Sequence, residues 1–459
     1  MLQTKHPDAA RLNKVIRAIV SKEYWGGRVM NAKVGNKRWE IIFLIVLCYV
    51  VLYMDRSCMS IAGPVMMKHF NWTATEFGLV STAFFIGYGC TQILGGWLAD
   101  RFGGGKIVII GALWWSVFVF LTPFGSTLGL MLAIRIAMGL GEGVCLPANS
   151  SIVAQWIPKK ESGFAQGLCL MGVPIGIVLT MPLSVWIMQN WNWQSIFYTF
   201  AFIAPIWVLL WQKFGKDKPE QHPAISKVEL EYIRADQGPQ GICSQAACVT
   251  ARDIFSTRSV WSCAVSYFCA NYLLYLFMTW LPTYFALGRH LTMDRTGMYS
   301  MFPYLVATFT YPLGGYLADC AAKKFGDNIG RKLYPVIGMI AAGILLIVGS
   351  QAASVGTAVA LISASNGFLC LTMGGFYSMP IVFSHRNAGK ITGVFATFAT
   401  IGGVTAPTIT GCIIDYFGSY EYALFVGAGV ALVGAMILLI SCNVRPIEEK
   451  ISQGSMLHI

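Results

Sequence analysis

Charged residues are scarce in this sequence. Asp, Glu, Lys and Arg together make up 12% of the 459 residues, whereas hydrophobic residues make up 56%, and the mean hydropathy is +0.60. A water-soluble domain of this length does not need so much apolar surface to fill its core. The composition therefore excludes a soluble globular protein and predicts an all-α protein that crosses the membrane many times.

The groupings of side chains that usually carry enzyme or metal chemistry are absent from the sequence. All six histidines lie outside or at the ends of the apolar segments, and the 13 cysteines form no C-x-x-C pair. The Gly-rich run 103–106 resembles a phosphate loop, but Ile107 stands where Ser or Thr would bind magnesium. We therefore expect no metal, no cofactor and no enzymatic activity.

Apolar runs long enough to cross a bilayer, about 20 residues each, occur twelve times along the chain. They cover approximately residues 41–67, 76–98, 107–125, 128–156, 163–189, 193–212, 260–287, 296–318, 333–352, 356–383, 390–414 and 421–442. The expected organisation is a basic N-terminal tail (1–40), a six-helix bundle (41–212), a cytoplasmic linker (213–258), a second six-helix bundle (259–443) and a C-terminal tail (444–459).

The two predicted bundles resemble each other. Gly-Gly-Trp-Leu-Ala-Asp-Arg at 95–101 closes the second span, and Gly-Gly-Tyr-Leu-Ala-Asp-Cys at 314–320 closes the eighth. Repeated halves with a shared central site are typical of secondary transporters, because rocking one half against the other exposes that site to each side in turn.

The basic residues are distributed unevenly across the predicted membrane. Of the 33 Lys and Arg residues, only Lys68, Arg289 and Arg295 lie on the side opposite the termini. This positive-inside pattern places both termini in the cytoplasm and accounts for the net charge of +12 without nucleic-acid binding. Within the tail, apolar residues at helical spacing between 12 and 19 fit either a basic helix lying on anionic lipid or a disordered positive tail.

Four charged residues lie inside the predicted spans: Asp55 and Arg56 in the first, and Arg135 and Glu142 in the fourth. A charge at the bilayer centre costs at least about 3 kcal/mol, so such residues usually mark a functional path. Arg135 and Glu142 share a helical face but lie about 10 Å apart, too far for direct pairing. Arg56 is the candidate that bridges the two spans.

These four residues suggest anion binding coupled to proton movement. The Arg56 guanidinium can present a planar donor fork to a carboxylate or phosphate. Asp55 and Glu142 can take up and release protons as a cavity alternates between the two sides. The alternative is a neutralised buried network that only holds the first and fourth spans together.

Five further polar side chains in the spans are candidate substrate ligands: Tyr53, Tyr88, Gln92, Asn271 and Tyr275. Aromatic core packing is the other interpretation of each tyrosine. A carboxamide at the depth of Asn271 requires a hydrogen-bond partner.

Charged loops follow the second and eighth spans. Asp100, Arg101 and Lys106 form the first, and Asp319 begins the second. These charges either latch the cytoplasmic face in one conformational state or only determine the membrane topology.

With these residues placed, the sequence resembles the major facilitator superfamily and, within it, the anion:cation symporter family, from Arg38 to about Arg445. The resemblance rests on Tyr-x-Asp-Arg at 53–56, on 91–101, on 135–149, on Thr-Trp-Leu-Pro-Thr-Tyr at 279–284 and on linker residues 221–233. It implies proton-coupled uptake of a small organic anion such as a sugar acid, with the proton as coupling ion.

The resemblance also implies roles for individual residues. Arg56 would bind the substrate carboxylate, Asp55 and Glu142 would be the proton sites, and Tyr53 and Tyr88 would hydrogen-bond the substrate. Arg135 would be the structural and electrostatic partner of Glu142.

The sequence departs from the sugar-acid branch at two positions. Val173 and Thr400 stand where those relatives tend to have a Gln and an Asn that bind hydroxyl groups. We therefore expect a less hydroxylated or more aromatic acid, with Phe376 and Tyr377 facing it. We also expect a monomer in a bacterial inner membrane; an anion or phosphate-ester exchanger without net proton coupling and a transporter-like sensor are the alternatives.

Overall fold

The computed structural model describes residues 35–237, 251–384 and 388–447. The apolar pattern of the N-terminal tail therefore lies outside the described residues. Helices account for nearly all of the described chain, as the shortage of polar residues in the spans requires, because a helix satisfies its backbone hydrogen bonds internally.

Nine α-helices form the first bundle, and short breaks divide its fourth, fifth and sixth spans into two helices each. They are α3 (Lys37–Phe70), α4 (Ala74–Phe102), α5 (Gly104–Leu121), α6 (Leu128–Glu142), α7 (Cys145–Trp156), α8 (Lys159–Leu170), α9 (Gly172–Asn190), α10 (Trp193–Ala201) and α11 (Ile203–Phe214). A 3-10 turn, η1 (Thr122–Phe124), follows α5.

The linker contributes short helices, and long helices form the second bundle. The linker elements are η2 (Pro219–Gln221), α12 (Lys227–Gln237) and α13 (Ala251–Ser256). The second bundle contains α14 (Arg258–Thr283), the π-helical turn η3 (Tyr284–Gly288), α15 (Met293–Gln351), α16 (Val355–Phe383), α17 (Ala388–Phe417) and α18 (Tyr420–Ser441).

The described helices account for the predicted spans. Ten helical segments of the described chain, some of them two consecutive helices, are long and apolar enough to cross a membrane, and the bent α4, with 46° between 74–92 and 94–102, makes an eleventh. Helix α15 has 59 residues, and Gly326 interrupts it with φ 78° and ψ 161°. Only glycine adopts this conformation readily, and it marks the place where two consecutive helices of α15 meet. These two parts of α15 correspond to the predicted eighth and ninth spans.

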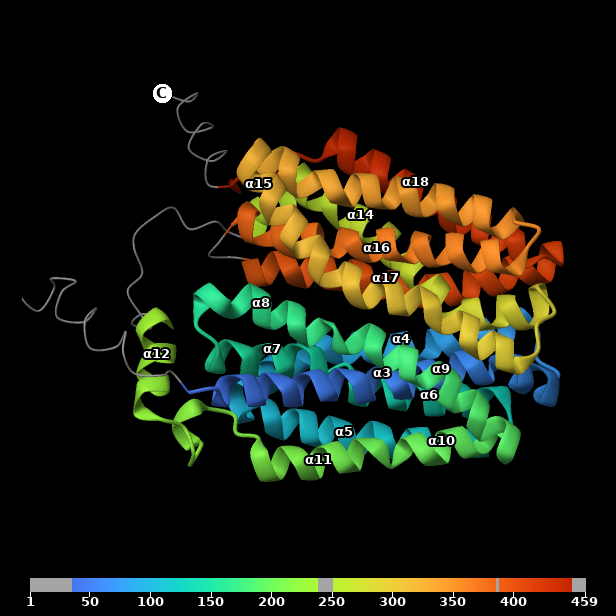
Figure 1. Ribbon diagram of the computed structural model, residues 1–459, viewed down its shortest axis with the longest axis horizontal. Helices are drawn as coiled ribbons and strands as arrows, with labels where there is room; N and C mark the ends of the chain where they lie inside the picture. The colour runs from blue at the N-terminus through green and yellow to red at the C-terminus, as the bar shows by residue number, and fades with distance from the viewer. Residues whose placement is uncertain (1–34, 238–250, 385–387, 448–459) are drawn as a thin grey trace, which may run out of the picture.

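The two bundles lie side by side, with α14–α18 on one side and α3–α11 on the other (Figure 1). Helix α4 packs against α17, α9 against α15 and α3 against α14. The approach is close: a Cβ atom added at Gly78 of α4 would lie 2.5 Å from the Pro407 carbonyl oxygen of α17. Small residues allow this packing.

Hydrogen bonds join the bundles at the end of the molecule that holds the loop 71–73, here called the far end. The Asp415 carboxylate on α17 accepts the backbone N–H groups of Ala74 (3.0 Å) and Thr75 (2.7 Å) at the start of α4. Gln189 on α9 also donates to Asp294 on α15. The far end is therefore closed in this conformation.

At the opposite end, two linker carboxylates cap helices of the first bundle. Glu229, which is fully buried, accepts the backbone N–H groups of Lys37 (3.3 Å) and Arg38 (3.0 Å) at the start of α3. Asp217 accepts the Gly105 N–H at 2.8 Å. The Gly-rich run that resembles a phosphate loop thus binds a carboxylate of its own chain, because helix N-termini attract anions.

Candidate functional site

A buried ion pair joins α3 to α6. Arg56 Nη2 lies 2.8 Å and Nε 3.2 Å from the same Glu142 oxygen, Oε2. The exposed fractions are 4% for Arg56 and 0% for Glu142. Oε1 of Glu142 has no hydrogen-bond partner among the described residues. Arg56 therefore bridges the first and fourth spans, as its position in the sequence predicts.

Aromatic rings enclose the Arg56 guanidinium. Its Cζ atom lies 4.7 Å from the ring centres of Tyr53 and Phe84 and 4.9 Å from that of Tyr88. Nη1 also donates to the Tyr53 hydroxyl at 3.5 Å. The faces of aromatic rings attract cations, so the enclosure holds the charged fork in place away from water.

Asp55 lies apart from this ion pair. Its Oδ2 accepts a hydrogen bond from Trp115 Nε1 on α5 at 2.8 Å, and its Oδ1 has no partner among the described residues. The side chain is fully buried. Neighbouring residues on a helix point about 100° apart, which explains why Asp55 and Arg56 face different helices.

Arg135 does not pair with Glu142 in the described structure. Its Nη1 lies 3.1 Å from Met138 Sδ, its Cζ lies 5.0 Å from the ring centre of Phe84, and its Nε has no partner among the described residues. Arg135 and Glu142 thus make no direct contact, as their separation on one helix predicts, and Arg56 reaches the carboxylate from the neighbouring helix.

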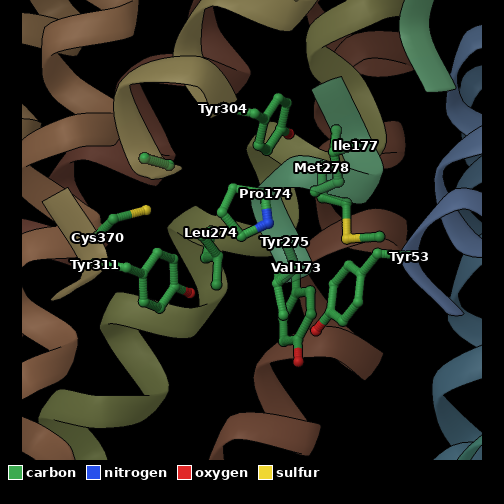
Figure 2. Close-up of a pocket in the computed structure, with 11 residues that line it drawn as sticks. Tyr53, Val173, Pro174, Ile177, Leu274, Tyr275, Met278, Tyr304, Tyr311 and Cys370 are labelled. Atoms are coloured by element: carbon green, nitrogen blue, oxygen red, sulfur yellow. The ribbon is translucent and has the colours of Figure 1, made fainter. Parts of the chain in front are cut away.

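A cavity lies between the bundles beside this site (Figure 2). It has about 20 Å³ of room for the centre of a water molecule, enough for about one water. The lining residues come from α3, α9, α14, α15 and α16: Tyr53, Val173, Pro174, Ile177, Leu274, Tyr275, Met278, Tyr304, Ala307, Tyr311 and Cys370.

The cavity includes two tyrosines that sequence reasoning missed, Tyr304 and Tyr311. They are seven residues apart in the eighth span and so lie on one helical face. The Tyr304 hydroxyl is buried and has no partner among the described residues. Two of the predicted ligands, Tyr53 and Tyr275, line the same cavity.

Other predicted ligands are engaged elsewhere. Gln92 on α4 and Thr400 on α17 meet across the bundles, with 3.1 Å between Oε1 and Oγ1. Asn271 donates to the Tyr267 carbonyl of its own helix at 2.8 Å, which satisfies the predicted need for a partner.

The predicted aromatic residues of α16 do not line the cavity. Phe376 is buried, and its ring centre lies 5.1 Å from that of Tyr267. Tyr377 is 44% exposed, and its ring centre lies 6.3 Å from that of Tyr267. Both rings therefore pack around Tyr267 of α14.

The charged loops interact within their own bundles. Asp100 accepts a hydrogen bond from Ser151 at 3.3 Å, and Asp319 pairs with Arg331. The Arg101 guanidinium lies over the rings of Trp97 and Phe102.

Lys106 is exposed at the start of α5. Within the described ranges, no hydrogen bond or ion pair of these loops crosses between the bundles. Those ranges also contain no group of three or more His, Cys, Asp or Glu side chains that could hold a metal ion.

Residues 45–325 match the Major Facilitator Superfamily. The chain belongs to this superfamily. It is 30% identical to the probable sulfoacetate transporter SauU of Cupriavidus necator over 88% of this chain and 93% of that protein. It is 31% identical to the chloroplastic ascorbate transporter of Arabidopsis thaliana, over 87% of this chain and 74% of that protein. It is 28% identical to the hexuronate transporter of Bacillus subtilis, over 91% of this chain and 97% of that protein. These relatives correspond to the anion:cation symporter family.

Solved structures of the superfamily share the fold. A D-xylose-proton symporter superposes with a TM-score of 0.69 at 12% identity, covering 88% of this chain and 98% of that one. An inward-facing bacterial homologue of the human lysosomal transporter Spinster superposes with a TM-score of 0.66 at 17% identity, covering 90% of this chain and 96% of that one. With the family match and the named relatives, the chain is a multi-pass membrane transporter and not an enzyme.

Proposed function

We propose that this transporter is a symporter that imports a small organic anion together with protons by alternating access. The single observation that carries this proposal is the buried Arg56–Glu142 ion pair beside the cavity between the bundles. The named relatives transport sulfoacetate, ascorbate and hexuronate, which supports a small anion as the substrate.

The ion pair provides a physical link between anion and proton. Arg56 presents its Nε and Nη2 donors to one Glu142 oxygen, so an incoming carboxylate that binds this same edge of the guanidinium replaces Glu142 there. An ionised Glu142 left without a partner at this depth would cost about 3–5 kcal/mol. Protonation of Glu142 removes that cost, so anion binding draws in a proton.

Asp55 is proposed as a second proton site. Its Oδ1 is buried without a partner, while Trp115 holds Oδ2. A carboxyl group in such surroundings gains stability from protonation because burial penalises its charged form. Asp55 is separate from the anion fork, so its protonation state can change without displacing the substrate.

The remaining parts of the proposal concern cellular context. The positions of the basic residues favour cytoplasmic termini, and two of the relatives are bacterial. We propose a bacterial inner membrane, with both termini in the cytoplasm and a single chain as the working unit.

The test uses purified protein in liposomes with an imposed pH gradient. Sulfoacetate, D-glucuronate and 4-hydroxybenzoate serve as labelled probes. The proposal expects gradient-driven accumulation of at least one probe and its loss in Glu142→Gln, whereas Glu421→Gln, an exposed carboxylate at the far end, accumulates normally. Uptake that ignores the pH gradient but shows counterflow would instead identify an exchanger.

A further inference from the structure

We infer that Trp115 is a positioning residue for proton coupling. Its indole N–H fixes the orientation of the Asp55 carboxylate and stabilises its ionised form, so that a proton arrives at the other carboxylate oxygen, Oδ1. This inference rests on the proposed function, because it names the residue that controls the proposed proton site Asp55. It follows from the hydrogen bond between the two side chains, from the charges around Asp55 and from the packing of α5.

The indole of Trp115 is the side-chain partner of the Asp55 carboxylate in the described structure. Nε1 lies 2.8 Å from Oδ2, and Oδ1 has no partner among the described residues. Both side chains are buried. An indole N–H donates a hydrogen bond and cannot accept one, so it stabilises the ionised carboxylate and disfavours a proton on Oδ2. A proton that reaches Asp55 therefore binds Oδ1.

Among the described residues, no cation pairs with Asp55. The neighbouring Arg56 pairs with Glu142, and the hydrogen bond of Arg135 goes to a methionine of its own helix. The Cys58 thiol lies near Asp55, but it bonds to the backbone carbonyl of Asp55 and not to the carboxylate. These charged residues are the ones buried within the described spans. A neutral donor, and not an ion pair, thus stabilises the charged form of Asp55.

Close packing of α5 against α6 fixes the position of this donor. A Cβ atom added at Gly111 of α5 would lie 2.7 Å from the Gly141 carbonyl oxygen of α6. One added at Gly141 would lie 3.0 Å from the Trp115 backbone nitrogen. Small residues allow helices in a membrane to approach this closely, so the backbone of Trp115 cannot shift toward α6. Gly141 precedes Glu142, so the same contact ties the donor of Asp55 to the helix turn that carries the other proposed proton site.

The first experiment needs no substrate. Thermal unfolding is measured from acid to alkaline pH for the unmodified chain, Trp115→Phe, Asp55→Asn and the double variant. Phenylalanine keeps an aromatic ring but has no N–H. We expect Trp115→Phe to lower the melting temperature more at alkaline than at acid pH, because the lost hydrogen bond is stronger to an ionised carboxylate than to a protonated one. In the Asp55→Asn background the loss should not depend on pH.

Each result of this cycle decides the role of Trp115. A loss that is equal at every pH, or that depends on pH in both backgrounds, would leave Trp115 as a packing residue and overturn the inference. If Trp115→Phe is too unstable to purify, the double variant decides. Its recovery supports the inference, because it has no carboxylate to leave buried without a partner, and its failure to fold overturns the inference.

The second experiment measures uptake of labelled sulfoacetate and D-glucuronate into liposomes as a function of pH. Without the indole donor, Asp55 keeps its proton to higher pH. The pH at which uptake is half-maximal should therefore rise by about one unit in Trp115→Phe, which is about a tenfold change in proton concentration. Reduced uptake with an unchanged pH midpoint would identify a purely structural role and overturn the inference.

Trp207→Phe is the matched control. Trp207 of α11 is buried, and its Nε1 donates to the Leu44 backbone carbonyl of α3 at 2.8 Å. The same substitution there breaks a bond of the same length to the same helix, but the acceptor does not titrate. Trp207→Phe should lower the melting temperature equally at every pH and leave the pH midpoint of uptake unchanged. A shift as large as that of Trp115→Phe would overturn the inference.

The outcomes separate this inference from the proposed function. Uptake by the unmodified chain that ignores the pH gradient would overturn the symporter and, with it, any coupling role of Trp115. Proton-driven uptake with the same pH midpoint in Trp115→Phe would sustain the symporter and overturn this inference alone.

Discussion

The two bundles differ in where they bury charge. In the described chain, every charged side chain buried within a span belongs to the first bundle: Asp55, Arg56, Arg135 and Glu142. The part of the second bundle that faces the cavity contributes phenol hydroxyls, apolar side chains and a thiol. Because both partners of the ion pair belong to one bundle, rocking of the bundles does not by itself separate Arg56 from Glu142.

Removing Arg56 should have the largest effect. Arg56→Gln leaves Glu142 buried without its partner, and we expect about 3–5 kcal/mol of destabilisation together with loss of anion binding. Thermal unfolding and uptake measure the two consequences. The double variant Arg56→Gln/Glu142→Gln should recover stability but not binding; recovered binding would show that the first bundle does not hold the anion.

Asp55→Asn should separate stability from coupling. The carboxamide oxygen can still accept the Trp115 hydrogen bond, so the change in stability should stay below about 1 kcal/mol. Accumulation driven by a pH gradient should nevertheless disappear, while counterflow persists. Accumulation equal to that of the unmodified chain would rule out Asp55 as a proton site.

Asp415→Asn tests a contact that crosses the bundles. The change weakens the charged cap on Ala74 and Thr75 by about 1 kcal/mol and should favour opening of the far end. Spin labels at Glu76 and Tyr416 would report longer distances. The control is Asp217→Asn, which weakens a similar cap on α5 that does not cross the bundles and should leave the label distances unchanged. If the distances between the labels grow in both variants, the effect is a general loss of helix capping and not opening of the far end.

Thr400→Ala should have the smallest effect. It removes the hydroxyl that contacts Gln92 across the bundles and the Ala396 carbonyl of its own helix, and such a hydrogen bond is worth about 0.5–1.5 kcal/mol. We expect apparent substrate affinity to change less than about fivefold. A loss of transport as complete as in Arg56→Gln would place a substrate contact in the second bundle at this position.

The spans and the buried charges could be predicted because both have large physical costs. A bilayer admits only long apolar helices, and a charge in one stands out against that background. The sequence also predicts separate eighth and ninth spans, but it does not show that the chain turns between them at Gly326.

Only part of the pairing among the buried charges could be predicted. The separation of about 10 Å between Arg135 and Glu142 points to Arg56 as the bridge to the fourth span, but the contacts of Arg135 with Met138 and Phe84 could not be predicted. Trp115 as the partner of Asp55 likewise depends on how α5 packs. Such contacts are set by tertiary packing and leave no local pattern in the sequence.

The bond between Trp115 and Asp55 has a consequence for observing the transporter at work. The indole N–H points directly at the carboxylate, and indole emission responds to a nearby charge. In a variant that keeps Trp115 and replaces the other 13 of the 14 tryptophans, the fluorescence of this one ring would report optically on protonation of Asp55, the proposed second proton site.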